Sequence, residues 1–93
     1  MQALYVCYDV TDDKRRTKLF KTLEGFGQHA QFSVFECYLD EKELLRLRAK
    51  VEEVIDTKED SVLYVYLCAA CHGRVEHLGV RKAPEVDADL IIV

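Results

Sequence analysis

The hydrophobic pattern of the chain switches between the periods typical of strands and of helices. Nearly continuous apolar runs, rich in aromatic and β-branched side chains, occupy residues 3–9, 31–39 and 61–68. Runs of this length and composition predict buried strands. Two shorter strands are predicted over residues 74–79 and 88–93, separated by a segment that holds the only proline.

Between the first two of these strands, apolar side chains recur every three or four positions, which predicts a helix over residues 12–26. Thr11 is its expected N-cap, because a side-chain oxygen at this position accepts from the free amides of the first turn. Gly25 and Gly27 are the expected stop signal at the other end.

A second helix is predicted over residues 41–55, where leucine, valine and isoleucine side chains form a stripe of the same period. Asp40 with Glu43 resembles a capping box, the reciprocal pair of contacts that begins many helices. The polar run over residues 56–60 then predicts a turn.

The order of strand, helix, strand, helix, strand and strand predicts an α+β protein. It suits a ferredoxin-like sandwich of the βαββαβ type, in which two helices cover one face of an antiparallel sheet, with an extra C-terminal strand. Residues 1–79 would form this core domain, and residues 80–93 the linker and the last strand.

One feature of the strands predicts a homodimer. An antiparallel sheet with helices on one face should alternate apolar and polar positions. The runs ALYVCY, SVLYVYLC and DLIIV are instead apolar at almost every position. Because two helices cover only one face, we expect two copies to pack sheet against sheet, with the last strand pairing with the partner's sheet edge. The alternative is that these side chains tolerate exposure.

The composition is that of an ordinary globular chain, with 49% hydrophobic and 32% charged residues among 93. No apolar run approaches the ~20 residues of a membrane helix, and no signal-peptide pattern begins the chain. We therefore expect a cytoplasmic protein with no membrane role. A net charge of -4 is not typical of a nucleic-acid-binding protein. If the protein binds nucleic acid, the binding must come from local clusters of cations.

The four cysteines divide into two pairs. Cys7 and Cys37 lie in apolar runs and are expected to be reduced core residues. Cys68 and Cys71, followed by His72, resemble half of a zinc site. Because the chain has no second pair of this kind, structural thiols are favoured over a zinc or redox role.

The first predicted strand ends in a single carboxylate, Asp9. One carboxylate is a poor Mg²⁺ site, since hard cations gather several oxygen ligands. If Asp9 lay near the two-fold axis of a dimer, two copies and several waters could hold one Mg²⁺. The competing interpretation is a loop aspartate that helps the following helix to begin.

Five cations follow this strand end within eight positions. Lys14, Lys18 and Lys21 are spaced four and three apart, so they are expected along one stripe of the helix. Arg15 and Arg16 are expected at the helix start, near the strand end. Such a cluster predicts contact with nucleic-acid phosphates. The alternative is a solvated helix face that pairs with neighbouring acids.

Three segments carry a resemblance to a known family: YVCYDVTDDKRRTKL, QFSVFECYLDEKEL and EDSVLYVYLC. In these segments the chain resembles the CRISPR-associated protein two family, the small partner of the spacer integrase. The resemblance implies a ferredoxin-like homodimer that acts as a Mg²⁺-dependent endonuclease on RNA or double-stranded DNA, in spacer acquisition and antiviral defence. It also implies a role in bridging integrase dimers.

The same resemblance implies roles for single residues. Asp9 matches the family's metal-binding aspartate, shared across the dimer axis, and Tyr8 matches the tyrosine before it. Arg15, Arg16 and Phe35 fall at positions assigned to phosphate binding or nuclease activity.

The residues and the resemblance leave three functions open. The first is a Mg²⁺-dependent endonuclease, and the second is a non-catalytic DNA-binding scaffold that bridges integrase dimers. Asp9 separates them, because hydrolysis should need it and scaffolding should not. The third and remotest is a small zinc-binding ferredoxin-like domain, which predicts tight zinc at Cys68, Cys71 and His72 and no affinity for nucleic acid.

Overall fold

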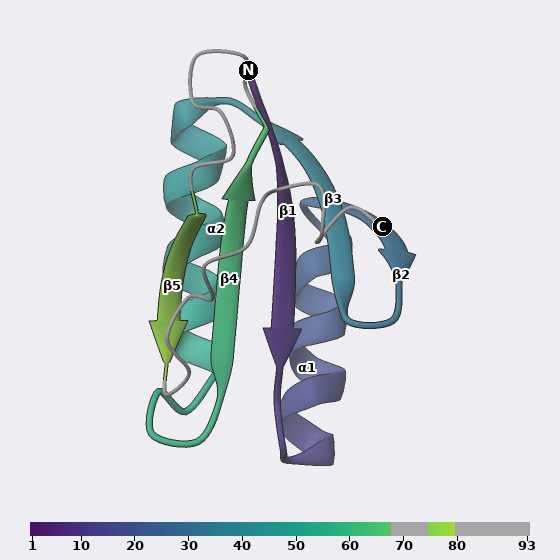
Figure 1. Ribbon diagram of the computed structural model, residues 1–93, viewed down its shortest axis with the longest axis vertical. Helices are drawn as coiled ribbons and strands as arrows, with labels where there is room; N and C mark the ends of the chain where they lie inside the picture. The colour runs from purple at the N-terminus through teal and green to yellow at the C-terminus, as the bar shows by residue number, and fades with distance from the viewer. Residues whose placement is uncertain (68–74, 80–93) are drawn as a thin grey trace.

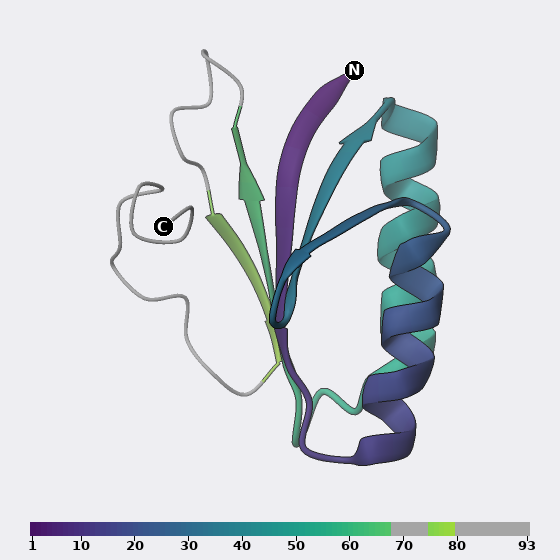
Figure 2. The ribbon, with the colours of Figure 1, turned by 90° about the vertical axis from the view of Figure 1, so that its right-hand side faces the viewer.

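The computed structural model describes residues 1–67 and 75–79. These residues form one antiparallel sheet of five strands, in the order β2-β3-β1-β4-β5, and two helices (Figure 1). In chain order the elements are β1 (Gln2–Asp9), α1 (Asp13–Glu24), β2 (Gly27–Gln31), β3 (Val34–Leu39), α2 (Glu41–Val54), β4 (Ser61–Tyr66) and β5 (Val75–Gly79). Both helices lie on the same side of the sheet (Figure 2). The predicted α+β sandwich is confirmed.

The core lies between the helices and the near face of the sheet. Alternate residues of β1 face the helices and are buried, namely Leu4, Val6 and Tyr8. From the helices, the predicted stripes supply fully buried side chains, among them Leu19, Leu23, Leu47 and Val51. The helical spacing of the apolar residues therefore identified the buried faces.

The predicted strand over residues 31–39 is wrong in its extent, because two strands occupy this region. β2 begins at Gly27 and pairs with β3 through a turn at Phe32 and Ser33. β2 has the sequence GQHAQ, is mostly exposed and forms the edge of the sheet. An exposed edge strand buries too little to show a hydrophobic period, so the pattern carried no sign of it.

Gly27 therefore does not stop the first helix, whose C-cap is Gly25. A Cβ atom at Gly27 would lie 2.4 Å from the carbonyl oxygen of Glu36 and 2.6 Å from the sulfur of Cys37. Both distances are shorter than any normal contact, so β2 and β3 approach each other this closely only with glycine at this position.

The first helix is capped by Asp12 and not by Thr11 as the sequence predicts. The Asp12 carboxylate accepts from the backbone amide of Arg15 at 2.9 Å. The second helix has the predicted capping box. The Asp40 carboxylate accepts from the amide of Glu43 at 2.7 Å, and the Glu43 carboxylate accepts from the amide of Asp40 at 3.1 Å.

The far face of the sheet carries the other half of the strand residues. By the strand register, Tyr5 and Cys7 of β1 lie beside Leu63 of β4 and Val34 of β3 on the side away from the helices. These four side chains are only partly exposed.

Burial raises the pKa of Cys7 and of Cys37 to about 11, so both thiols stay protonated at neutral pH, as expected for packed residues.

Some predictions lie outside the described residues, namely the CAACH segment over residues 68–72 and the linker and last strand over residues 80–93. The homodimer also stays a prediction. Within the part of the chain that the structure describes, no helix is long and apolar enough to cross a membrane.

Candidate nucleic-acid interface

Asp9 lies at the carboxyl end of β1, where it is exposed and opposite Ser61 of β4. Strand residues alternate between the two faces of a sheet. Asp9 therefore shares the far face with Cys7, whereas Tyr8 shares the near face with the helices. The structure thus separates two residues that the resemblance groups together, and it directs Asp9 to the face where a second copy is expected.

The carboxylates in the part of the chain that the structure describes do not gather into a Mg²⁺ site. Among the described residues, no group of three or more His, Cys, Asp or Glu side chains could hold a metal ion. Since Mg²⁺ demands nearly octahedral oxygen coordination, Asp9 of a single chain is not sufficient. A Mg²⁺ site at Asp9 would therefore need further oxygen ligands besides those that the described residues of one chain place there.

Arg16 projects from the first turn of α1 back towards the end of β1. Its Nη1 atom donates to the carbonyl oxygen of Val10 at 3.2 Å, and its Nη2 atom pairs with the Asp13 carboxylate. The Arg16 side chain remains 46% exposed. Because a guanidinium has five N–H donors, Arg16 retains donors that can contact a phosphate.

Tyr8 is buried beneath this arginine, with 7% of its surface exposed. Burial raises the pKa of Tyr8 above its ordinary value, and the charge of Arg16 opposes that shift only in part. The phenol is therefore protonated at neutral pH. It can donate a hydrogen bond but does not act as a general base.

Phe35 is fully buried and does not reach the surface. Its ring lies 5.1 Å from the ring of Phe20, 5.3 Å from His29 and 6.3 Å from Tyr8. Phe35 therefore supports an aromatic cluster that joins β1, β2, β3 and α1, and any effect of Phe35 on activity would act through these neighbours.

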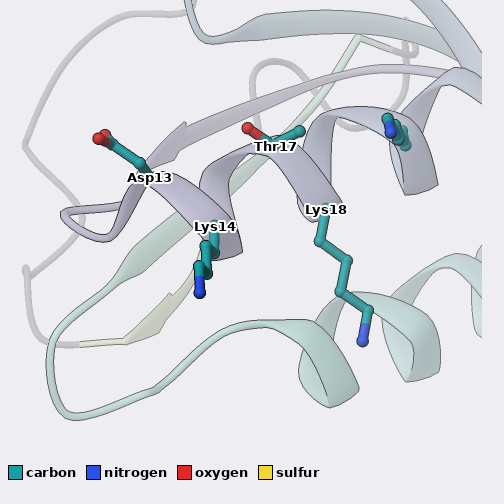
Figure 3. A pocket seen from close by; sticks show the side chains of 5 residues that line it. Asp13, Lys14, Thr17 and Lys18 are labelled. Carbon is teal, nitrogen blue, oxygen red and sulfur yellow. The ribbon is translucent and has the colours of Figure 1, made fainter.

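The three predicted stripe lysines do share one side of α1. Lys14, Lys18 and Lys21 line a shallow depression of about 410 Å³ together with Asp13 and Thr17. Figure 3 shows the Lys14 and Lys18 side chains leaving the helix on the same side. We call Lys14, Lys18 and Lys21 the lysine row. All three are exposed, so their ammonium groups are accessible to a phosphate backbone.

Arg15 has a different environment from its neighbour Arg16. Its Nε atom donates to Asp60 at 2.8 Å, and its Nη2 atom donates to Asp60 at 3.2 Å and to Glu59 at 3.0 Å. Hydrogen bonding to Asp60 is the main cause that raises the pKa of Arg15 above its ordinary value. This guanidinium is therefore held by carboxylates of the loop before β4.

Asp60 is a residue of this region that the sequence did not identify. It is fully buried, and it also accepts from the backbone amides of Asp56 at 2.9 Å and Thr11 at 3.4 Å. Burial alone would raise the pKa of Asp60, but these hydrogen bonds outweigh it and hold the pKa below its ordinary value. Asp60 thus ties the loop after β1 to the loop before β4.

The composition of its segment does not distinguish Asp60 from its neighbours. It belongs to the polar run DTKED, which predicts an exposed turn. The one available signal is its position directly before the apolar strand β4, where the chain enters the core.

Arg48 of α2 also makes contacts within the fold. Its Nη2 atom donates to the hydroxyl of Tyr66 and to the carboxylate of Glu76, and its guanidinium lies 4.9 Å from the ring centroid of Tyr64. Arg48 therefore joins α2 to β4 and β5. Among the described cations, the lysine row and Arg16 lie on or near the helix that follows β1.

Known proteins resemble the chain over most of its length. The family model described as CRISPR associated protein Cas2 matches residues 1–75. A Chloroflexus aurantiacus protein named CRISPR-associated endoribonuclease Cas2 1 is 39% identical, over 95% of this chain and 96% of its own length. A Thermus thermophilus protein named CRISPR-associated endonuclease Cas2 2 is 46% identical, over 87% and 86% respectively.

Two crystal structures share the fold. A hypothetical protein from Thermus thermophilus matches with a TM-score of 0.70 and 40% identity, over 90% of this chain and 98% of that one. Streptococcus pyogenes Cas2, crystallised at pH 6.5, matches with a TM-score of 0.67 and 30% identity, over 74% and 89%. The sequence matches and the shared architecture agree: the chain belongs to the CRISPR-associated protein Cas2 family.

Proposed function

We propose that this protein is a Mg²⁺-dependent endonuclease that cleaves RNA or double-stranded DNA in the cytoplasm, as part of spacer acquisition and antiviral defence. Relatives that it matches over nearly their full length are named endoribonuclease or endonuclease. The observation that carries the proposal is the position of Asp9, exposed at the end of β1, directly before a helix whose outer side bears the lysine row.

In this proposal the active form is a homodimer. The far face of the sheet, with Tyr5, Cys7 and Leu63, would pack against the same face of a second copy. Because Asp9 shares this face, the dimer would bring two Asp9 carboxylates towards one axis. Two carboxylates with several waters make a plausible oxygen set for Mg²⁺.

Each residue at the end of β1 then has a separate task. The lysine row would hold the phosphates of the substrate, with Arg16 nearest the scissile group, where its charge would stabilise the negative charge that develops. Arg15, held by Asp60 and Glu59, would position the loop rather than bind phosphate. Mg²⁺, when bound, would polarise a phosphoryl oxygen and lower the pKa of a bound water.

The test is a nuclease assay on RNA and on duplex DNA, with Mg²⁺ and with EDTA. Asp9→Asn keeps the size of the side chain but removes the charge. It should abolish Mg²⁺-dependent cleavage of whichever substrate the wild type cuts, while binding is retained. Glu53→Gln is the matched control, because it removes one charge from an exposed position on α2. If Asp9→Asn cleaves as fast as the wild type, the proposed site is wrong.

A second outcome would favour the scaffold function. Both wild type and Asp9→Asn would then fail to cleave, yet both would bind duplex DNA and a CRISPR integrase subunit. The family is that of CRISPR-associated proteins, so a partner from the same system is expected in either case.

A further inference from the structure

A second depression, of about 500 Å³, lies on the helix side of the sheet between α1 and the turn that joins β2 to β3. We call it the aromatic groove. Its lining includes Phe20, His29 and Phe32, the cations Arg16 and Lys21, and Glu24. Of the residues that line this groove, the proposed function uses only Arg16 and Lys21.

The floor of the groove is aromatic and packs against the core. The rings of Phe20 and His29 lie 5.1 Å apart, edge to face. Both rings also contact the buried ring of Phe35, at 5.1 and 5.3 Å. Phe35 is fully buried, so the rings of Phe20 and His29 pack against a residue of the core. A flat apolar ligand could therefore lie against a surface that needs little rearrangement.

Phe32 stands at the rim of the groove in an unusual state. Its side chain is 87% exposed, and its backbone has a φ angle of 46°. A bulky residue rarely adopts positive φ, and here the ring of His29 contacts the Phe32 carbonyl oxygen through Nε2 at 2.6 Å. The turn thus leaves a large apolar ring exposed, and packing against the described residues does not explain its position.

The charges around the groove indicate which part of a ligand would enter it. Arg16 and Lys21 attract phosphate, whereas the carboxylate of Glu24 repels it. The groove also shares Thr17 and Lys21 with the depression lined by the lysine row. A strand of nucleic acid could therefore run its phosphates along the lysines and turn a neutral base into the groove.

We propose that the aromatic groove binds one unstacked base of a single-stranded nucleic acid, with Phe32 and His29 in contact with the base and the lysine row on the adjacent phosphates. Aromatic side chains bind single strands in this way because every base presents a π face. An intact duplex keeps its bases stacked and offers none without unpairing. The inference rests on the proposed nucleic-acid function and narrows it to the form of substrate that this surface recognises.

The test measures binding by fluorescence anisotropy in EDTA, where cleavage is prevented. The probes are a labelled oligodeoxyadenylate and a strand of equal length made of abasic units. The wild type should bind the base-bearing strand about tenfold more tightly, since one base stacked on an aromatic side chain adds affinity of this order. Phe32→Ala should abolish the difference. Phe32→Tyr, which keeps an aromatic ring, should preserve it.

Leu45→Ala is the matched control, since it truncates another exposed apolar side chain, at 65% exposure, on α2. It should bind like the wild type. Equal affinity of the wild type for both strands, or an undiminished preference in Phe32→Ala, would overturn the base site while leaving phosphate binding intact. If the wild type binds neither these strands nor RNA nor duplex DNA, the proposed function itself fails, and the inference fails with it.

Discussion

The ion pair between Arg15 and Asp60 makes the sharpest test of how this region is held together. We perturb it with Asp60→Asn, which keeps the shape of the side chain, and with Arg15→Met, which keeps the apolar stem. The first change places an amide NH₂ group where a carboxylate oxygen accepts hydrogen bonds. Because Asp60 is fully buried, water cannot take over the lost contacts.

The expected magnitude follows from the hydrogen bonds of the two carboxylate oxygens. Oδ2 accepts from Arg15 Nε at 2.8 Å and from the Asp56 amide at 2.9 Å, and Oδ1 accepts from Arg15 Nη2 at 3.2 Å and from the Thr11 amide at 3.4 Å. Asparagine loses one of these oxygens, and with it two bonds to a charged group, each worth ~1.5 kcal/mol or more. Asp60→Asn should therefore lower the unfolding free energy by about 3 kcal/mol.

The assay is urea denaturation at neutral pH and at one fixed protein concentration, which matters if the chain dimerises. The double-mutant cycle of Asp60→Asn and Arg15→Met should give a coupling energy clearly above that of an exposed pair. Arg16 and Asp13 supply that control within the same helix, because Asp13 is 87% exposed. Exposed pairs of this kind typically couple by ~0.5 kcal/mol.

Two results would refute the reasoning. One is a coupling energy for Arg15 and Asp60 no larger than that of the control pair. The other is an Arg15→Met variant of unchanged stability but weakened nucleic-acid binding. In that case Arg15 would be a phosphate contact, and the hydrogen bonds from the backbone amides would be enough to stabilise the buried Asp60 carboxylate.

Three further predictions concern pH, packing and salt. The pKa of Asp60 is lower in the folded than in the unfolded chain, so the stability that its charge contributes is present above about pH 4 and is lost as the pH falls through the folded value. Urea denaturation below pH 4 should therefore show that the unfolding free energy falls less steeply with pH in Asp60→Asn than in the wild type. Gly27→Ala should destabilise the fold by ~2 kcal/mol through overpacking against β3. Gly25→Ala should be tolerated, since its Cβ would meet only the Thr22 carbonyl oxygen at 3.3 Å. Equal thermal unfolding temperatures of the two variants would contradict this. Reversing the charge of the lysine row should weaken binding to nucleic acids of all sequences. It should also reduce the slope of log K against log salt concentration by about 0.9 per lost phosphate contact on duplex DNA. An unchanged slope in a salt titration would show that the binding surface lies elsewhere.

The sequence by itself determined most of the architecture. Apolar runs located β1 and β4, helical spacing identified the buried stripes of both helices, and Asp40 with Glu43 marked the start of α2. These signals are local, because a residue's neighbours three or four positions away decide which face it shares. The position of Asp9 at a strand end and the common side of the lysine row are of the same kind, and both were predictable.

Only the tertiary structure decided the rest. β2 escaped notice because an exposed edge strand has no hydrophobic period. Arg15 and Arg16 are adjacent cations that the sequence treats alike, yet one reaches a buried carboxylate 45 residues further along the chain and the other stays half exposed. Such a contact depends on how two loops meet at one end of the sheet. A periodic pattern indicates which side of a helix or strand faces the core. It does not indicate which side chain from a distant part of the sequence will contact that side.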